Sequence, residues 1–349
     1  MADQATRAEN AALPALRWAE PPEGPVLVLL DQTRLPHEEV ELVCTDVHAL
    51  VAAIRSLAVR GAPLLGLAGA YGVALAAGRG YDVEEAAELL SQARPTAVNL
   101  SYGVRRALEA HRKAEPGQAA AAALAEARAL HAEDAVASRA MAEHGSRLLG
   151  ELVPGGGFRL LTHCNTGALV SGGEGTALGV VLAVHRAGGL RRLWVDETRP
   201  LLQGARLTAY EAARAGMPYT LLSDNAAGSL FTGGEVDAVL VGADRIAADG
   251  STANKVGTYP LAVLARYHHV PFVVVAPTTT VDLDTPDGAS IEVEQRAGSE
   301  VTDLAPSPLG TQAYNPAFDV TPPELITAIV TENGVVSPVT AETLAAVCR

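Results

Sequence analysis

Five short apolar runs in the second half of the chain constrain its fold more than any other feature. The runs are FRLLTHC, RLWVDET, YTLLSD, AVLVGAD and FVVVAP, and helical patterns such as GTALGVVLAVHRAG and LTAYEAARAG lie between them. Strands that are apolar throughout are covered on both faces, and their alternation with helices is typical of a parallel sheet. We therefore predict an α/β fold, in which the carboxyl ends of four of these strands deliver polar side chains to one edge.

The first half of the chain has a different pattern. It reads as two short strands at 24–36 and 38–46, followed by helices over 47–58, from the RGAP segment (60–63) to about 77, and over 84–92, 96–111 and 118–149. Residues 1–20 are expected to be a loosely held leader. The PGGG segment at 154–157 breaks the last helix, so we predict two domains, residues 1–153 and 154–349.

Composition excludes several classes of function. The chain has 349 residues with 26 basic and 40 acidic side chains, a net charge of −14 that argues against broad nucleic-acid binding. No apolar run reaches the ~18–20 residues of a membrane-spanning helix, and no signal peptide is visible. The three cysteines are widely spaced, which disfavours a disulfide scaffold or a cysteine zinc site and favours the cytoplasm.

Two strand ends carry candidate catalytic groups. Cys164 follows the first apolar run, ahead of a glycine-rich loop (171–175) and a helix start whose free N–H groups favour anions. A buried cysteine that only fills space remains the alternative. Asp244 follows a later run, where burial raises a carboxyl pKa and suits a general acid. A helix cap or an ion pair with Arg245 is the alternative reading.

Three basic residues are candidate phosphate ligands. Arg60 and Arg94 each lie at a predicted helix start, although a single arginine in such a place is more often a surface residue. Lys255 follows Asn254 and is one of only two lysines among the 26 basic residues. A lysine supplies a point charge for phosphate, and asparagine supplies donors and an acceptor.

Long motifs along nearly the whole chain resemble the methylthioribose-1-phosphate isomerase family, which is related to the α, β and δ subunits of initiation factor 2B and to ribose-1,5-bisphosphate isomerase. They are RGAP, RPTAVNL, LTHCNTGAL with GGEGTALG, DETRPLLQGARLTAYE, SDNAA, VGADRIAADGSTANKVGTYPLA and NPAFDVTPPELITAIVTENGV. The resemblance implies a helical N-terminal domain with a small antiparallel sheet, a C-terminal Rossmann-like parallel-sheet domain, and a homodimer. It also implies isomerisation of an aldose 1-phosphate to a ketose 1-phosphate in methionine salvage.

The same resemblance assigns site residues. Cys164 and Asp244 match the catalytic pair, and the substrate-binding positions are matched by Arg60, Gly61, Ala62, Arg94, Gln203, Asn254 and Lys255. The expected partner is a small-molecule sugar phosphate, without nucleic acid or membrane. The chemistry requires neither a metal nor a redox cofactor, and no histidine-rich metal spacing appears.

Several alternatives stay open at this stage. Hydrogen can move from C2 to C1 through an enediol or as a hydride, and Cys164 fits either route. Glu174 stands where the family often has tyrosine, and an inward carboxylate there disfavours a second phosphate on the sugar. Other 5-modified ribose 1-phosphates, such as 5-deoxyribose 1-phosphate or ribose 1,5-bisphosphate, remain alternative substrates. A non-catalytic subunit like those of factor 2B is the alternative from another functional class.

Overall fold

The computed structural model describes residues 14–304 and 306–348. It begins with a three-stranded antiparallel sheet in the order β1-β2-β3, formed by Leu16–Ala19, Val26–Leu30 and Glu41–Cys44. The expected leader is wrong for residues 16–19, because these pair with 26–29 of β2. Its residues 1–13 lie outside the part that the structure describes. The two strands expected at 24–36 and 38–46 are confirmed as β2 and β3.

Helices follow this sheet in the places that the apolar spacing predicts. They are α2 (Val47–Arg55), α3 (Ala62–Arg79), α4 (Val83–Ser91), α5 (Val98–Lys113) and α6 (Ala119–Leu152). Asp46 and Asp82 cap α2 and α4 by accepting hydrogen bonds from backbone N–H groups. Helix α3 is buried over most of its length and packs between α5 and α6, which places its N-terminus in the interior.

The second half of the chain contains a seven-stranded sheet in the order β14-β13-β10-β7-β4-β5-β6. Its strands are β4 (Phe158–Thr162), β5 (Leu190–Asp196), β6 (Tyr219–Leu222), β7 (Ala238–Val241), β10 (Phe272–Val275), β13 (Ala328–Thr331) and β14 (Gly334–Val336). All neighbours are parallel except β13 and β14. The five strands expected from the apolar runs are confirmed, and so is the mixed α/β fold with a small antiparallel sheet.

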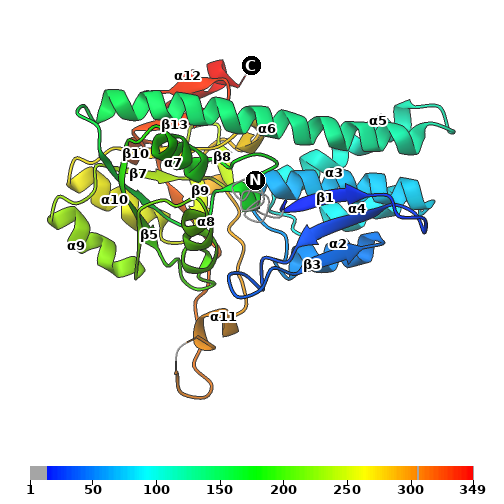
Figure 1. Cartoon of the computed structure of the whole chain (residues 1–349), viewed down its shortest axis with the longest axis horizontal. Helices are drawn as coiled ribbons and strands as arrows, with labels where there is room; N and C mark the ends of the chain where they lie inside the picture. The colour runs from blue at the N-terminus through cyan, green and yellow to red at the C-terminus, as the bar shows by residue number, and fades with distance from the viewer. Residues whose placement is uncertain (1–13, 305, 349) are drawn as a thin grey trace, which may run out of the picture.

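Helices cover both faces of this sheet, as apolar strands require. On one face, Leu160 and Leu240 pack under α6 and α7 (Ala177–Arg186). On the other face, Leu161 and Val239 pack under α9 (Ala227–Thr232), α10 (Thr258–Tyr267) and α12 (Ala341–Val347). Helix α8 (Ala209–Arg214) packs beside β6. The two layers of helices are seen around the sheet in Figure 1.

A second small sheet was not expected from the sequence. It has the order β11-β8-β9-β12, with strands Val281–Asp282, Arg245–Ala247, Thr252–Lys255 and Phe318–Thr321. These strands have two to four residues, too few for a periodic apolar pattern. The chain between β11 and β12 carries the short helix α11 (Ser299–Thr302) in a loop that projects from the body (Figure 1).

Helix α6 joins the two halves of the molecule. Figure 1 shows it running along both. Its Ala127 and Leu130 belong to the core around α3, whereas Met141 and Leu149 belong to the core under the large sheet. The division into domains at residues 153 and 154 stays a prediction.

Candidate active site

Cys164 lies just beyond the carboxyl end of β4, in a backbone conformation that side chains seldom adopt. Its φ is +63°, in the left-handed region. Two threonine hydroxyls hold it there: Cys164 N–H donates to Thr198 Oγ1 at 2.8 Å, and Thr208 Oγ1 donates to the Cys164 carbonyl at 2.6 Å. The surroundings thus over-determine a strained position, as is common at functional sites. The residue is 6% exposed.

Arg60 reaches the thiol from the start of α3. Its Nη1 lies 3.8 Å from Cys164 Sγ, and its Nη2 donates to Asn165 Oδ1 at 2.6 Å. Gly61 follows with a φ of +90°, and a Cβ there would lie 2.4 Å from the Val170 side chain. Ala62 begins the helix, and no side chain in the described residues caps it. The positive end of the α3 dipole therefore reinforces Arg60.

Asp244 lies across from Arg60, between β7 and β8. It shares a small cavity with Ala62 and Arg94, and Phe318 forms another wall. Burial raises the pKa of Asp244, while the charges of Lys255, Arg94 and Arg60 oppose this rise. No hydrogen bond to its carboxylate is found within residues 14–304 and 306–348. The alternative reading, an ion pair with Arg245, is not seen in the same residues, since Arg245 pairs with Asp282 at 3.7 Å.

Lys255 is buried at the end of β9. Its Nζ donates to the Ala317 carbonyl at 2.9 Å and lies 5.2 Å from the centre of the Phe318 ring. Burial lowers the pKa of Lys255, and the nearby Cys164 and Asp244 act in the opposite direction. Lys255 is therefore close enough to both candidate catalytic groups to interact with their charges.

The other expected ligands differ in how they are placed. Arg94 Nη2 pairs with Glu294 at 2.7 Å, while its Nε is buried and has no partner in the described chain. Arg94 lies in the loop before α5, four residues ahead of the first residue of that helix. Gln203 Oε1 is likewise buried without a partner there. Asn254 points its amide at Thr258 Oγ1, 2.9 Å away. The structure thus groups Arg60, Arg94 and Lys255 around Asp244.

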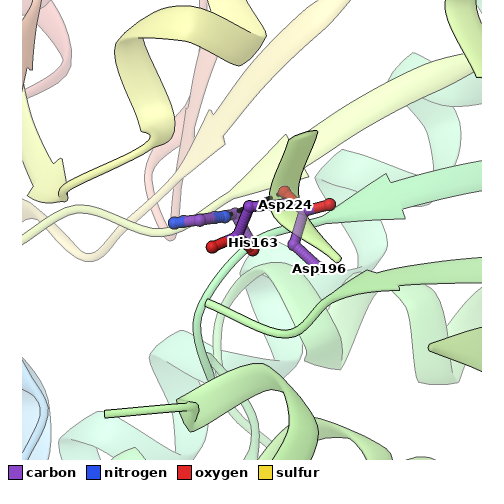
Figure 2. A group of neighbouring side chains, drawn as sticks. All are labelled: His163, Asp196 and Asp224. Atoms are coloured by element: carbon purple, nitrogen blue, oxygen red, sulfur yellow. Dashed lines mark hydrogen bonds and ion pairs between the residues drawn. The ribbon is translucent and has the colours of Figure 1, made fainter. Parts of the chain in front are cut away.

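His163 turns away from the neighbouring thiol, as its place in the strand predicts. Its Nε2 donates to the Val256 carbonyl at 2.9 Å, which leaves Nδ1 facing Asp196 Oδ2, also at 2.9 Å (Figure 2). Although burial acts to lower it, the bond and charge of Asp196 raise the pKa of His163.

Asp224 completes the group drawn in Figure 2. Its two carboxylate oxygens accept the N–H groups of Thr198 and Arg199, each at 2.7 Å. Asp224 therefore holds the loop that carries Thr198, whose Oγ1 accepts the N–H of Cys164. This group already uses its hydrogen-bonding atoms within the protein, apart from Asp196 Oδ1, which has no partner in the described residues. It therefore does not fit a set of open metal ligands.

The glycine-rich loop does not offer the anion site expected of it. The N–H groups of Gly172, Gly173 and Glu174 donate to Asp134, Ser171 and Ser138, respectively. Glu174 also turns outward and pairs with Arg186 at 2.7 Å. An inward carboxylate at 174, the condition under which a second phosphate is disfavoured, is therefore not observed.

Four positioning contacts were missed from the sequence. They come from Asn165, Thr198, Thr208 and Glu211. A π-helical turn, Gly204–Thr208, precedes α8 and presents Thr208 and Glu211 to the Cys164 segment. A π turn has no signal in the sequence, although the motif containing Gln203 and Gly204 was singled out. Gly204 is required by packing, since a Cβ there would lie 1.7 Å from the Asp196 carbonyl.

Comparison with known proteins finds similar sequences and structures over most of the chain. The initiation factor 2 subunit family model matches residues 58–338. Methylthioribose-1-phosphate isomerases from Pelotomaculum thermopropionicum and Anaeromyxobacter sp. strain K are 49% and 54% identical. They align over 93% and 88% of this chain and over 92% and 90% of their own lengths.

Two solved structures are also similar over nearly all of the chain. The 5-methylthioribose 1-phosphate isomerase of Pyrococcus horikoshii OT3 has a TM-score of 0.86 at 37% identity, covering 97% of both chains. A structure described as translation initiation factor eIF-2B, subunit delta, from A. fulgidus has a TM-score of 0.80 at 41% identity, covering 96% of this chain and 100% of its own. The chain therefore belongs to the initiation factor 2 subunit family and, within it, to the methylthioribose-1-phosphate isomerases, which confirms the resemblance seen in the sequence.

Proposed function

We propose that the chain is an aldose–ketose isomerase that converts S-methyl-5-thio-α-D-ribose 1-phosphate to S-methyl-5-thio-D-ribulose 1-phosphate in methionine salvage. The names of relatives about 50% identical over most of the chain support this substrate. The observation that carries the proposal is the convergence of Cys164 and Asp244 with three cations in a buried site.

The cations suit the phosphate of this substrate. Arg60, Arg94 and Lys255 surround Asp244, and the uncapped start of α3 adds the partial positive charge of its N–H groups. A phosphate dianion offsets this excess of positive charge. Gln203 and Asn254 then provide neutral donors and acceptors for the sugar hydroxyls.

Asp244 is the general acid of the proposed reaction. Burial keeps its pKa above the ordinary carboxyl range, so more of it is protonated near neutral pH than of an exposed aspartate. The proton passes to the ring oxygen as the bond between C1 and that oxygen breaks. The bonding electrons stay on the oxygen, which becomes the C4 hydroxyl, and C1 becomes an electrophilic carbon that still bears the phosphate.

Hydrogen transfer from C2 to C1 completes the isomerisation by one of two routes. In the hydride route, hydrogen moves with its electron pair from C2 to C1, and the C2 hydroxyl loses its proton to the Cys164 thiolate. In the enediol route, Cys164 removes the proton from C2, and the electron pair of that bond forms a C1–C2 double bond. A proton is then added to C1, and the C2 hydroxyl loses its proton as the ketone forms. Both routes give a C1 methylene and a C2 ketone, and both leave the proton count unchanged.

Two substrate alternatives and one functional alternative follow from the same site. The sugars are 5-deoxyribose 1-phosphate and ribose 1,5-bisphosphate, the second being no longer disfavoured by Glu174. The resemblance to the A. fulgidus protein leaves a non-catalytic subunit as the functional alternative.

We also propose a cytoplasmic homodimer, which the free thiols of Cys44, Cys164 and Cys348 and the resemblance to the family support. No helix in the described residues is long and apolar enough to cross a membrane.

A comparison of substrates tests the proposal. The kcat/KM of the purified protein is measured with the three sugar phosphates, using phosphorus NMR to follow each ketose product. The proposal expects the methylthio sugar to have the highest kcat/KM. A higher value for another sugar would reassign the substrate, and no turnover of any of them would favour the non-catalytic subunit.

A further inference from the structure

The first turn after the π-helical segment holds the peptide that carries the thiol. Thr208 and Glu211 are three residues apart and therefore lie on the same side of the helix. Thr208 Oγ1 donates to the Cys164 carbonyl, and Asn165 Nδ2 lies 3.3 Å from Thr208 Oγ1 and 2.5 Å from Glu211 Oε2. One side of this helix thus contacts both Cys164 and its neighbour.

The carboxylate of Glu211 fits closely into the loop that follows Cys164. Its Oε1 accepts the N–H of Leu169 at 3.2 Å. A Cβ on Gly167 would lie 2.4 Å from the same carboxylate, so a side chain at this position would displace Glu211 from its present place. Burial raises the pKa of Glu211, and its hydrogen bonds oppose that rise.

The side-chain amide of Asn165 connects Glu211 to Arg60 by one hydrogen bond on each side. Because its Nδ2 faces Glu211, its Oδ1 faces Arg60, whose Nη2 donates to it at 2.6 Å. A second N–H of that guanidinium, on Nη1, lies 3.8 Å from Cys164 Sγ. If the Asn165 amide were rotated by half a turn, its N–H groups would face the guanidinium of Arg60. A guanidinium has only donors, so no hydrogen bond would form.

We propose that Glu211 is a positioning residue that acts through Asn165 to hold the guanidinium of Arg60 against the Cys164 thiol. Glu211 does not touch the substrate in this proposal. Its carboxylate fixes the orientation of the Asn165 amide, and the amide fixes Arg60. The expected effect on turnover rests on the proposed isomerase function, whereas the expected effect on the thiol does not.

Two substitutions of Glu211 separate positioning from charge. Glu211→Leu removes both the negative charge and the acceptor for Asn165, whereas Glu211→Gln removes the charge and keeps an acceptor oxygen. The first readout is the rate at which iodoacetamide alkylates Cys164 at a fixed pH, measured on the Cys164 peptide by mass spectrometry. The thiolate is the reactive form of a cysteine, so the alkylation rate reports on the charged groups held against Sγ, of which Arg60 Nη1 lies 3.8 Å away.

The proposal and a pure charge effect predict opposite results. If Glu211 positions Arg60, the guanidinium moves away from Cys164 Sγ in Glu211→Leu. Alkylation then slows by about tenfold, the effect of removing a positive charge from beside the thiolate, and Glu211→Gln recovers most of the rate. The kcat of isomerisation falls in parallel. If Glu211 acts only through its charge, both variants react faster than the wild type by a similar factor. That result, or an unchanged rate in Glu211→Leu, would overturn the proposal.

Asn165→Ala provides an independent test should Glu211→Leu fail to fold. It removes the side-chain oxygen that accepts from Arg60 Nη2 at 2.6 Å and leaves the backbone carbonyl of residue 165, which accepts from the same nitrogen at 3.2 Å. Alkylation slows because the shorter bond is lost, and an unchanged rate rejects the proposal. If Glu211→Leu does fold, the double variant that carries both Glu211→Leu and Asn165→Ala is alkylated no more slowly than Asn165→Ala alone, because both changes interrupt the same series of hydrogen bonds. The matched control is Asp134→Asn, which neutralises a partly buried carboxylate that binds Ser171 and Gly172 and leaves the alkylation rate unchanged.

The experiments distinguish a failure of the proposed isomerase function from a failure of the proposed role of Glu211. Slower alkylation in Glu211→Leu that recovers in Glu211→Gln, without turnover of any sugar phosphate, would retain the role of Glu211 and reject the isomerase function. Normal turnover with an unchanged alkylation rate in Glu211→Leu would retain the isomerase and reject the role of Glu211.

Discussion

Replacing Asp244 with asparagine removes the proposed proton donor while preserving the shape of the side chain. The expected loss is about 10²–10⁴-fold in kcat, the usual contribution of a general acid, or roughly 3–5 kcal/mol of transition-state stabilisation. Binding of the sugar phosphate should survive, since Arg60, Arg94 and Lys255 remain in place. Their attraction for phosphate is no longer opposed by a carboxylate, so KM stays the same or falls.

The folded structure should tolerate this change well. Because burial raises the folded pKa of Asp244 above its unfolded value of about 3.8, the ionised form is disfavoured in the folded protein at pH 7. The stability of the wild type therefore decreases as pH rises between these two pKa values. An asparagine in its place would carry no such penalty, so the melting temperature of Asp244→Asn at pH 7 should match or exceed that of the wild type.

The assay combines kinetics with thermal unfolding. Steady-state turnover gives kcat and KM across pH, and the melting temperature reports folding. The activity of the wild type should fall as pH rises through the raised pKa of Asp244, because the protonated acid is then lost. A variant that keeps at least a third of the wild-type kcat would refute the assignment of Asp244.

Other substitutions test the binding groups. Lys255→Met should raise KM by about 10–100-fold, the loss of one charge-assisted contact, with a smaller change in kcat. Arg94→Gln should raise KM similarly and should release Glu294, its partner at 2.7 Å. An unchanged KM in steady-state kinetics would exclude either side chain as a phosphate ligand. Gly61→Ala should lower the free energy of unfolding by about 2–4 kcal/mol, because its Cβ would overlap Val170 at a positive φ. Urea unfolding measures this loss, and an unchanged midpoint would contradict it.

Much of the fold could be predicted because its strands are buried on both faces. The five apolar runs and the switch to helical spacing leave few arrangements other than a covered parallel sheet. The scarcity of lysine singled out Lys255, and burial at a strand end singled out Asp244. The small sheet that holds Lys255 escaped prediction, because its strands are too short for a pattern and pair with segments far along the chain.

The support around the thiol could not be predicted, for a related reason. The positive φ of Cys164 and the π turn before α8 leave no mark in a local sequence pattern. The roles of Thr208 and Glu211 depend on that turn, which brings them against Asn165 from 43 and 46 residues away along the chain. Similarly, the glycine-rich loop looks like an anion site until α6 is seen to supply Asp134 to its N–H groups.

Proton NMR of the purified protein with S-methyl-5-thioribose 1-phosphate in deuterated water tests the central claim most directly. The proposed function predicts that the signal of the ketose C1 methylene appears at a rate that depends on enzyme concentration. Incorporation of one deuterium into the C1 methylene would favour the enediol route, because only one of its two hydrogens is transferred. Two protium atoms at C1 would favour the hydride route or a base shielded from solvent. Unchanged substrate at high enzyme concentration, with the protein folded, would contradict the claim.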